Sequence, residues 1–342
     1  MASMDKAETS DAILAKEKSG VRNKILKIFF DNFVWLLVIG LFIVAFFTTP
    51  SFFSSANVSN LLIQSVVLAL LVVAESVCLI TGYFDMSIES ILIFTAVFAS
   101  WLVAPHPAAS GLELNGYLGI ALILLTGAII GAINGFLIAY LKMNAFIATL
   151  SMSIILIGSC VTISKGSTLG PLPEVFRFLG RGNVGPIPAS IITMVVVYLI
   201  FIVIFKFTPY GRKLYSVGGN PNAAQASGVN VKWIVFTAYL LSGLISALGG
   251  LVLAGRMGAA VSHMTRNNLL YAFAAAVIGG VSPFGGQGKM ISIFGGVILL
   301  VSINKLLIIA DVDPFLITAV SGIIIFVAML ILTIKQKLVL ED

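Results

Sequence analysis

Two charged side chains lie inside long apolar runs of this 342-residue sequence, where they could take part in chemistry within a membrane. Glu75 stands about five residues from the end of one run, and Lys305 stands near the end of another. A bare carboxylate in lipid is costly, so Glu75 should face other helices or a wet cavity, and burial favours its neutral form. It could hold a structural hydrogen bond to a neighbouring serine, contact a solute or relay protons. Lys305 could extend its stem to the membrane surface or contact the same solute.

The side chains that build common catalytic and metal sites are scarce. The two histidines, His106 and His263, have no partner at metal-ligand spacing, and no Ser/His/Asp arrangement can be recognised. A GxxxxGK[ST] phosphate loop is absent from the sequence. Cys78 and Cys160 fall near opposite membrane faces, so a disulfide between them is not expected. We therefore expect a protein that has no catalytic site, metal ion or cofactor of its own.

Glycine-rich breaks interrupt the apolar runs at two places. ITGYFDMSIES covers residues 80–90, and IGGVSPFGGQGK covers residues 278–289. Gly82 can end one helix, and Asp85 or Ser87 can cap the next. Turns at the membrane surface would explain both breaks, but glycine-broken spans also line transport pathways. The residues that we predict for an inner gate or a partner contact are Gly82, Asp85, Ser87, Phe284, Gly285 and Gly286.

The segment from Lys206 to Lys232 differs from everything around it, because it is basic and rich in small residues. Asn220 can cap a helix, and Pro221 suits the first helical position. Gly228 can take the left-handed conformation that ends a helix. The predicted two-turn helix, roughly 10 Å long, is marginal alone in water and needs a partner. Its small alanine side chains would let another protein on the same side of the membrane approach closely.

Composition sets the class of protein. Apolar residues make up 59% of the chain and charged residues 10%, whereas a soluble domain carries about 25% charged residues. Backbone amides cannot stay unpaired in lipid, so apolar runs of about 20 residues should be spanning helices. The ten predicted runs are 31–49, 60–80, 88–104, 117–141, 144–164, 186–207, 232–254, 268–283, 290–310 and 315–334. The run 268–283 is short and carries Gly279 and Gly280, so it could dip into the membrane without crossing it.

Basic residues give an orientation. If all ten runs cross, fourteen of the twenty Lys and Arg residues fall on the side of the N-terminus. The positive-inside rule then places both termini and the segment 206–232 in the cytoplasm. The net charge of +6 reflects this bias near anionic lipid and needs no nucleic acid to explain it. The predicted organisation is a basic N-terminal segment 1–30, a single transmembrane domain 31–335 and a cytoplasmic tail 336–342.

Three segments resemble the permease subunits of ribose-type ABC importers, which serve ribose, xylose, galactose and related solutes. They are residues 80–90, residues 211–231 (GRKLYSVGGNPNAAQASGVNV) and residues 274–299 (AAAVIGGVSPFGGQGKMISIFGGVIL). The resemblance extends from about residue 33 to about residue 335, and its middle segment is the most specific. It implies an all-α polytopic membrane protein with about ten transmembrane helices, of the type II ABC importer kind.

The resemblance also implies partners. Two permease subunits, by default a homodimer, would sit in the bacterial cytoplasmic membrane. Cytoplasmic ATP-binding subunits would hold ATP and Mg and carry out hydrolysis, and an extracytoplasmic solute-binding protein would deliver a monosaccharide or related sugar for alternating-access transport. The residues implied in ATPase coupling are Arg212, Gly218, Gly219, Asn220, Pro221, Ala223, Ala224, Ser227 and Gly228. Glu75 and Lys305 are the candidates for the pathway itself.

The chain departs from this family's pattern at several positions. Tyr83 and Phe84 precede Asp85 where relatives carry a glycine and a small or aliphatic residue, and Glu75 and Glu89 replace uncharged residues. These differences bear on which solute passes. The alternative function is a secondary transporter driven by an ion gradient through Glu75. A membrane scaffold that transports nothing is a further alternative. Vitamin-type and branched-chain amino-acid importers share the general machinery, but the three segments favour the sugar branch.

Overall fold

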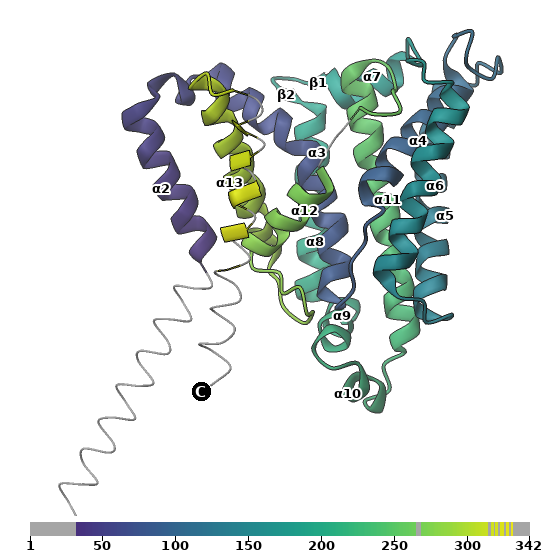
Figure 1. The fold of residues 1–342 in the computed structure, drawn as a ribbon, viewed down its shortest axis with the longest axis vertical. Coiled ribbons are helices and arrows are strands. Elements are labelled where there is room, and N and C mark those ends of the chain that lie inside the picture. Colours follow the sequence, from purple (N-terminus) through teal and green to yellow (C-terminus); the bar gives the residue numbers. More distant parts are fainter. Residues whose placement is uncertain are drawn as a thin grey trace, which may run out of the picture.

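The computed structural model describes residues 32–264 and 268–313, with isolated positions between 316 and 330 (Figure 1). The predicted N-terminal segment 1–30, the tail 336–342 and much of the run 315–334 lie outside these residues. The elements, in chain order, are α2 (Phe33–Thr48), η1 (Pro50–Phe53), α3 (Ser55–Ile80), α4 (Ile88–Val103), α5 (Gly116–Ala139), α6 (Ala145–Ser164), α7 (Glu174–Arg181), β1 (Asn183–Val184), β2 (Ile187–Pro188), α8 (Ala189–Phe207), α9 (Pro209–Gly219), α10 (Pro221–Ala226), α11 (Val231–Met257), α12 (Asn268–Ile278) and α13 (Met290–Ile309).

Six helices in the described part are long and apolar enough to cross a membrane, namely α3, α5, α6, α8, α11 and α13. Each corresponds to one of the predicted runs. Three further apolar helices, α2, α4 and α12, are shorter. With 16 and 11 residues, α4 and α12 rise roughly 24 Å and 16 Å, less than the ~30 Å hydrocarbon core. The helical part of each is therefore shorter than that core, and α2, with 16 residues, is as short as α4.

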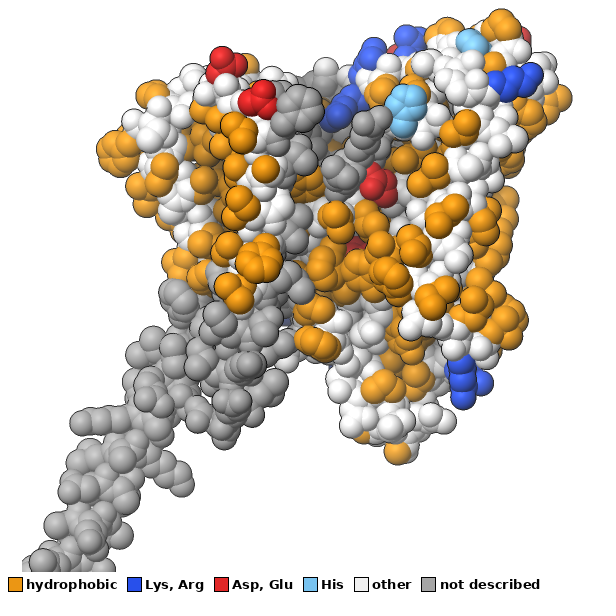
Figure 2. Space-filling model, in the orientation of Figure 1, with side chains coloured by type: hydrophobic (Ala, Val, Ile, Leu, Met, Phe, Trp, Pro, Cys, Tyr) orange, Lys and Arg blue, Asp and Glu red, His pale blue; other side chains and the backbone are white. Residues whose placement is uncertain are grey.

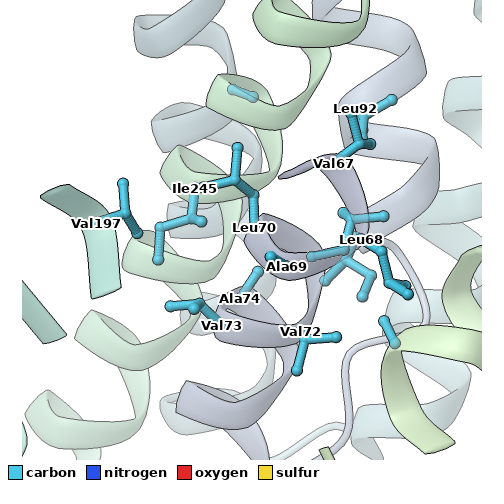
Figure 3. Packing of buried hydrophobic residues seen from close by; sticks show 14 of the residues in the cluster. Val67, Leu68, Ala69, Leu70, Val72, Val73, Ala74, Leu92, Val197 and Ile245 are labelled. Carbon is cyan, nitrogen blue, oxygen red and sulfur yellow. The ribbon is translucent and has the colours of Figure 1, made fainter. Parts of the chain in front are cut away.

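Helix α3 forms the centre of the molecule. It packs against α8, α11, α12 and α13, and its residues 65–80 are all buried (Figure 1). Its leucines and valines interlock with Leu92 of α4, Val197 of α8 and Ile245 of α11 (Figure 3). Because lipid is as apolar as leucine, this contact stabilises the bundle by close packing rather than by removing surface from water.

Glycines bring α5 and α11 into backbone contact. A Cβ at Gly243 of α11 would lie 2.9 Å from the backbone N and Cα of Gly131 in α5. A side chain at Gly135 of α5 would meet the carbonyl of Phe236 at 2.7 Å. The two helices therefore pack as closely as the backbone allows. Helix α11 also packs against α4.

The two ends of the bundle carry different structures (Figure 1). At one end lie α7 and the short antiparallel pair β1–β2, in which Val184 faces Ile187. The opposite end carries α9 and α10, and we refer to it as the α10 end. The extra strands are too short to change the predicted all-helical class.

Candidate functional site

The predicted short helix of the segment 206–232 is present as α10, and its predicted ends are confirmed. The side chain of Asn220 accepts a hydrogen bond from the backbone N–H of Ala223 at 3.0 Å, with Pro221 at the first helical position. Gly228 has a φ of +80°, so it is left-handed as expected. Of the helix residues only Ala224 is buried. The remaining surface of α10 is open to a partner.

A second helix, α9, occupies the same segment and was not predicted. Thr208 caps it, because its hydroxyl accepts from the N–H of Gly211 at 3.2 Å. Pro209 takes the first helical position. The dipeptide Thr-Pro is a helix-start signal that could have revealed α9. The glycines further along obscured it, since glycine weakens a helix interior.

Four glycines from three parts of the chain meet where α9 ends. We call this set, Gly82, Gly218, Gly285 and Gly286, the glycine junction. A Cβ at Gly285 would lie 2.6 Å from the carbonyl oxygen of Gly218 and 2.9 Å from the Cα of Gly82. The N–H of Gly286 donates to the carbonyl of Ile80 at 2.9 Å. Residues from both predicted breaks and from the coupling segment therefore touch, which spacing in the sequence did not show.

A tyrosine hydrogen bond supports the glycine junction. The hydroxyl of Tyr215 in α9 donates to the carbonyl of Gly288 at 2.6 Å. Burial raises the pKa of Tyr215 to about 12, so the hydroxyl keeps its proton at physiological pH. The loop 279–289 is thus tied to the helix that leads directly into α10.

Other predicted coupling and gate residues lie at the surface. Phe284 is 76% exposed, although it stands next to the glycine junction. The exposed members of the predicted set are Arg212, Gly219, Asn220, Pro221, Ala223, Ser227 and Gly228. The hydroxyl of Ser227 donates to the carbonyl of Ala223 within its own helix. Asn220 and Ser227 therefore use their side chains at the two ends of α10, and the surface around them is exposed.

Asp85 lies inside the bundle, and the interpretation of residues 80–90 as a turn at the membrane surface is wrong. Its carboxylate is fully buried. Oxygen Oδ1 accepts from the N–H and the hydroxyl of Ser87 at 2.9 and 2.6 Å, and Oδ2 accepts from the hydroxyl of Ser242 at 2.9 Å. Ser242 is the twelfth residue of the 27-residue helix α11, about 17 Å from its start. The segment between α3 and α4 therefore turns back into the bundle.

Polar residues from three neighbouring helices hold this re-entrant segment. Asn134 of α5 donates to the hydroxyl of Ser87 at 2.8 Å, and Tyr239 of α11 donates to the carbonyl of Phe84 at 2.9 Å. The hydroxyl of Thr149 in α6 accepts from the N–H of Met86 at 3.0 Å. Sequence reasoning missed these partners. Their signal was a polar side chain in an otherwise apolar run, which does not say what the side chain meets.

The two charged pathway candidates are not brought together. Glu75 is fully buried in α3, and neither of its carboxylate oxygens has a hydrogen-bond partner in the described part of the chain. Asp85 is close enough to interact electrostatically with it. Lys305 lies in α13, partly buried, and no ion pair joins it to Glu75.

Glu89 has a contact that the sequence did not indicate. It lies in the first turn of α4, where an acid complements the helix dipole. Its two carboxylate oxygens also accept from the backbone N–H groups of Asn268 and Leu269, at 3.1 and 3.2 Å. These amides belong to the first turn of α12, so one acid contacts the starts of two short helices.

The structure adds little that could bind a metal ion. Within the described ranges, no group of three or more His, Cys, Asp or Glu residues could hold one. Cys78 and Cys160 are both free and buried. His106 uses Nδ1 to accept from the N–H of Ala108, which stabilises a turn.

Fold and site together define a multi-pass membrane protein with a re-entrant polar segment in its core and an exposed helix at one end. The family described as "Branched-chain amino acid transport system / permease component" matches residues 57–333. The chain belongs to this family and is a multi-pass protein of the inner membrane.

Curated relatives match over most of both chains. The ribose import permease protein RbsC of Haemophilus influenzae is 33% identical over 82% of this chain and 86% of its own. RbsC of Bacillus subtilis is 34% identical over 89% of this chain and 95% of its own. The L-arabinose transport system permease protein AraH of Escherichia coli is 32% identical over 90% and 92%. No solved structure matches.

Proposed function

We propose that this chain is the permease subunit of an ATP-driven importer that moves a monosaccharide or a related sugar by alternating access. The observation that carries the proposal is the agreement of its relatives. Similarity covers 82–90% of the chain and connects it to permeases named for ribose and L-arabinose. Another relative is the galactose/methyl galactoside import permease protein MglC of Haemophilus influenzae. Relatives that share a fold but differ in sugar support the class of substrate and not one member of it.

Helix α10 is proposed as the coupling helix. All of its residues except Ala224 are exposed and free to dock on an ATP-binding subunit, and its first turn follows closely after the glycine junction. A displacement of α10 would therefore act on both glycine-rich breaks at once. The chain supplies no catalytic site to this cycle in the proposal. ATP and Mg would be bound by the partner.

The remaining parts of the proposal concern topology and assembly. Ten spans with both termini in the cytoplasm would place α10 on the cytoplasmic face and α7 on the opposite face. A solute-binding protein would then dock at the α7 end, and a second copy of the chain would complete the pathway. The 14-to-6 distribution of basic residues and the exposure of α10 support this orientation.

The ion-driven alternative gains no support. The relatives are named as import permease proteins and transport-system permease proteins. Glu75 has no ion pair among the described residues, and the acid that interacts with it electrostatically, Asp85, is itself held by Ser87 and Ser242.

The test is purification of the tagged chain from its native membrane, followed by mass spectrometry and transport in proteoliposomes. We expect an ATP-binding subunit and a sugar-binding protein to co-purify. The reconstituted complex should accumulate labelled ribose, galactose or arabinose only when ATP is present on the side of the membrane that the ATP-binding subunit faces. Uptake by the chain alone that a protonophore abolishes would overturn the proposal.

A further inference from the structure

Two short helices begin near the middle of the bundle. The segment before α4 is fixed to Ser242 of α11 by Asp85, and Leu92 in the second turn of α4 lies against Gly250. Glu89 lies between Asp85 and Leu92 in the chain, so it lies beside the part of α11 between Ser242 and Gly250, near the midpoint of that 27-residue helix. Helix α12 also begins at this depth, because its first amides contact Glu89. The amino ends of both short helices therefore meet inside the membrane-spanning region.

The contact between them is a charge-assisted link. The first amides of a helix have no partner within that helix, and the helix dipole makes them attractive to an anion. Glu89 offers one carboxylate oxygen to Asn268 and the other to Leu269. We call this pair of hydrogen bonds the Glu89 link. It joins parts of the chain 179 and 180 residues apart.

A second contact joins α12 to the segment that leads into α4. The rings of Phe84, in the re-entrant segment, and Phe273, in α12, meet edge to face with centroids 4.8 Å apart. The re-entrant segment follows directly from Gly82 of the glycine junction. Contacts therefore run without a break from α9 and α10, through residues 82–87, to α12.

The link is not fully enclosed by the protein. Glu89 is only partly buried, unlike Asp85 and Glu75. The space-filling view shows acidic side chains among hydrophobic ones on the face between the α2–α13 side and the α4–α6 side (Figure 2). Breaking the link would release the start of α12 from the start of α4.

We propose that Glu89 is a positioning residue that latches α12 to α4 at mid-membrane, and that transport requires this latch to form and to release. The inference rests on the proposed importer function, since alternating access needs two arrangements of the bundle. In the arrangement described here the latch is closed. Movement of α10 would reach it through the glycine junction and the re-entrant segment.

The test compares Glu89→Ala with Glu89→Gln in the complete complex. The alanine variant removes both acceptors, whereas glutamine keeps one oxygen and loses the charge. We expect Glu89→Ala to lower sugar uptake about tenfold while ATP hydrolysis without solute is retained or rises. Glu89→Gln should fall between Glu89→Ala and the wild type. The matched control is Glu113→Ala, an exposed acid in the loop between α4 and α5 that takes no part in the Glu89 link.

A distance measurement separates a latch from a merely structural role. Spin labels at Leu270→Cys on α12 and Ile133→Cys on α5, both exposed positions, report the separation of α12 from the α4–α5 unit. We expect Glu89→Ala to broaden or shift that distance distribution, and Glu113→Ala to leave it unchanged. Wild-type uptake, or an unchanged distribution, in Glu89→Ala would overturn the latch. If the wild type takes up no sugar, that result would count against the proposed function. The distance measurement would still show whether Glu89 holds α12 to α4.

Discussion

At the scale of single residues, Glu75 is the acid with the least favourable surroundings. Both carboxylate oxygens are buried and lack hydrogen-bond partners in the described chain, and an ionised group there would be very costly. Glutamine has nearly the same shape and no charge. We expect Glu75→Gln to keep sugar uptake within about twofold of the wild type, whereas Glu75→Lys should prevent accumulation of the folded protein. Uptake assays and membrane yields check both. Loss of uptake by a well-folded Glu75→Gln variant would give the carboxyl group a role in transport.

Asp85 is expected to behave differently, because it accepts three hydrogen bonds. Replacing it with alanine leaves the donors on Ser87 and Ser242 without an acceptor in a buried site. Unsatisfied buried donors cost about 1–3 kcal/mol each, while hydrogen bonds between membrane helices average only about 0.6 kcal/mol. Asp85→Ala should therefore lower the thermal stability of the detergent-solubilised protein clearly more than Ser242→Ala does. Equal shifts in Tm would show that Asp85 is held by packing alone.

At the scale of elements, the glycine junction offers a matched pair of neighbouring residues. A Cβ at Gly218 would collide with the carbonyl of Ile80 and approach the N–H of Gly286, whereas a Cβ at Gly219 meets nothing within 4 Å. Both residues belong to the last turn of α9, so alanine favours the helix equally at each. We expect Gly218→Ala to lower solute-stimulated ATP hydrolysis and uptake by about tenfold or more, and Gly219→Ala to remain close to the wild type. Similar activities in the two variants would remove the junction from the coupling route.

Helix α10 gives a second test at this scale. Ala223 is exposed but Ala224 is buried, so only Ala223 can be changed without disturbing the support of the helix. Arginine at position 223 should obstruct docking of the ATP-binding subunit and lower its recovery in a pull-down. The chain itself should still insert and fold. Met143→Arg, an exposed position between α5 and α6, is the control. Full recovery of the ATP-binding subunit with Ala223→Arg would place the docking surface elsewhere.

The same elements show what sequence could and could not predict. Runs of about 20 apolar residues identified the long helices, and Asn220, Pro221 and Gly228 identified α10, because these signals are local. How deep a residue lies in the bundle depends on contacts with residues far away in the sequence. Hydropathy cannot tell a span from a half-length helix that begins inside the membrane, so Asp85 was placed at the surface. The contacts Asp85–Ser242 and Glu89–Asn268 join residues 157 and 179 positions apart, and neither partner's spacing reveals the other.

At the scale of the whole molecule, the exposed apolar faces need a lipid or protein neighbour. Many large apolar side chains on α2, α5, α6 and α8 are exposed in the single chain, including Phe47, Ile129, Ile154 and Leu199. Lipid covers such faces in any membrane protein, but a pathway between two subunits requires one of them to meet a second copy. We expect the purified complex to contain two copies of the 36.2 kDa chain for each transport unit, measured by native mass spectrometry in detergent. Cross-linking through cysteines placed on one exposed face at a time should capture the dimer from one face only. A complex with a single copy, or with one copy and a similar but distinct permease, would exclude the homodimer while leaving the importer function in place.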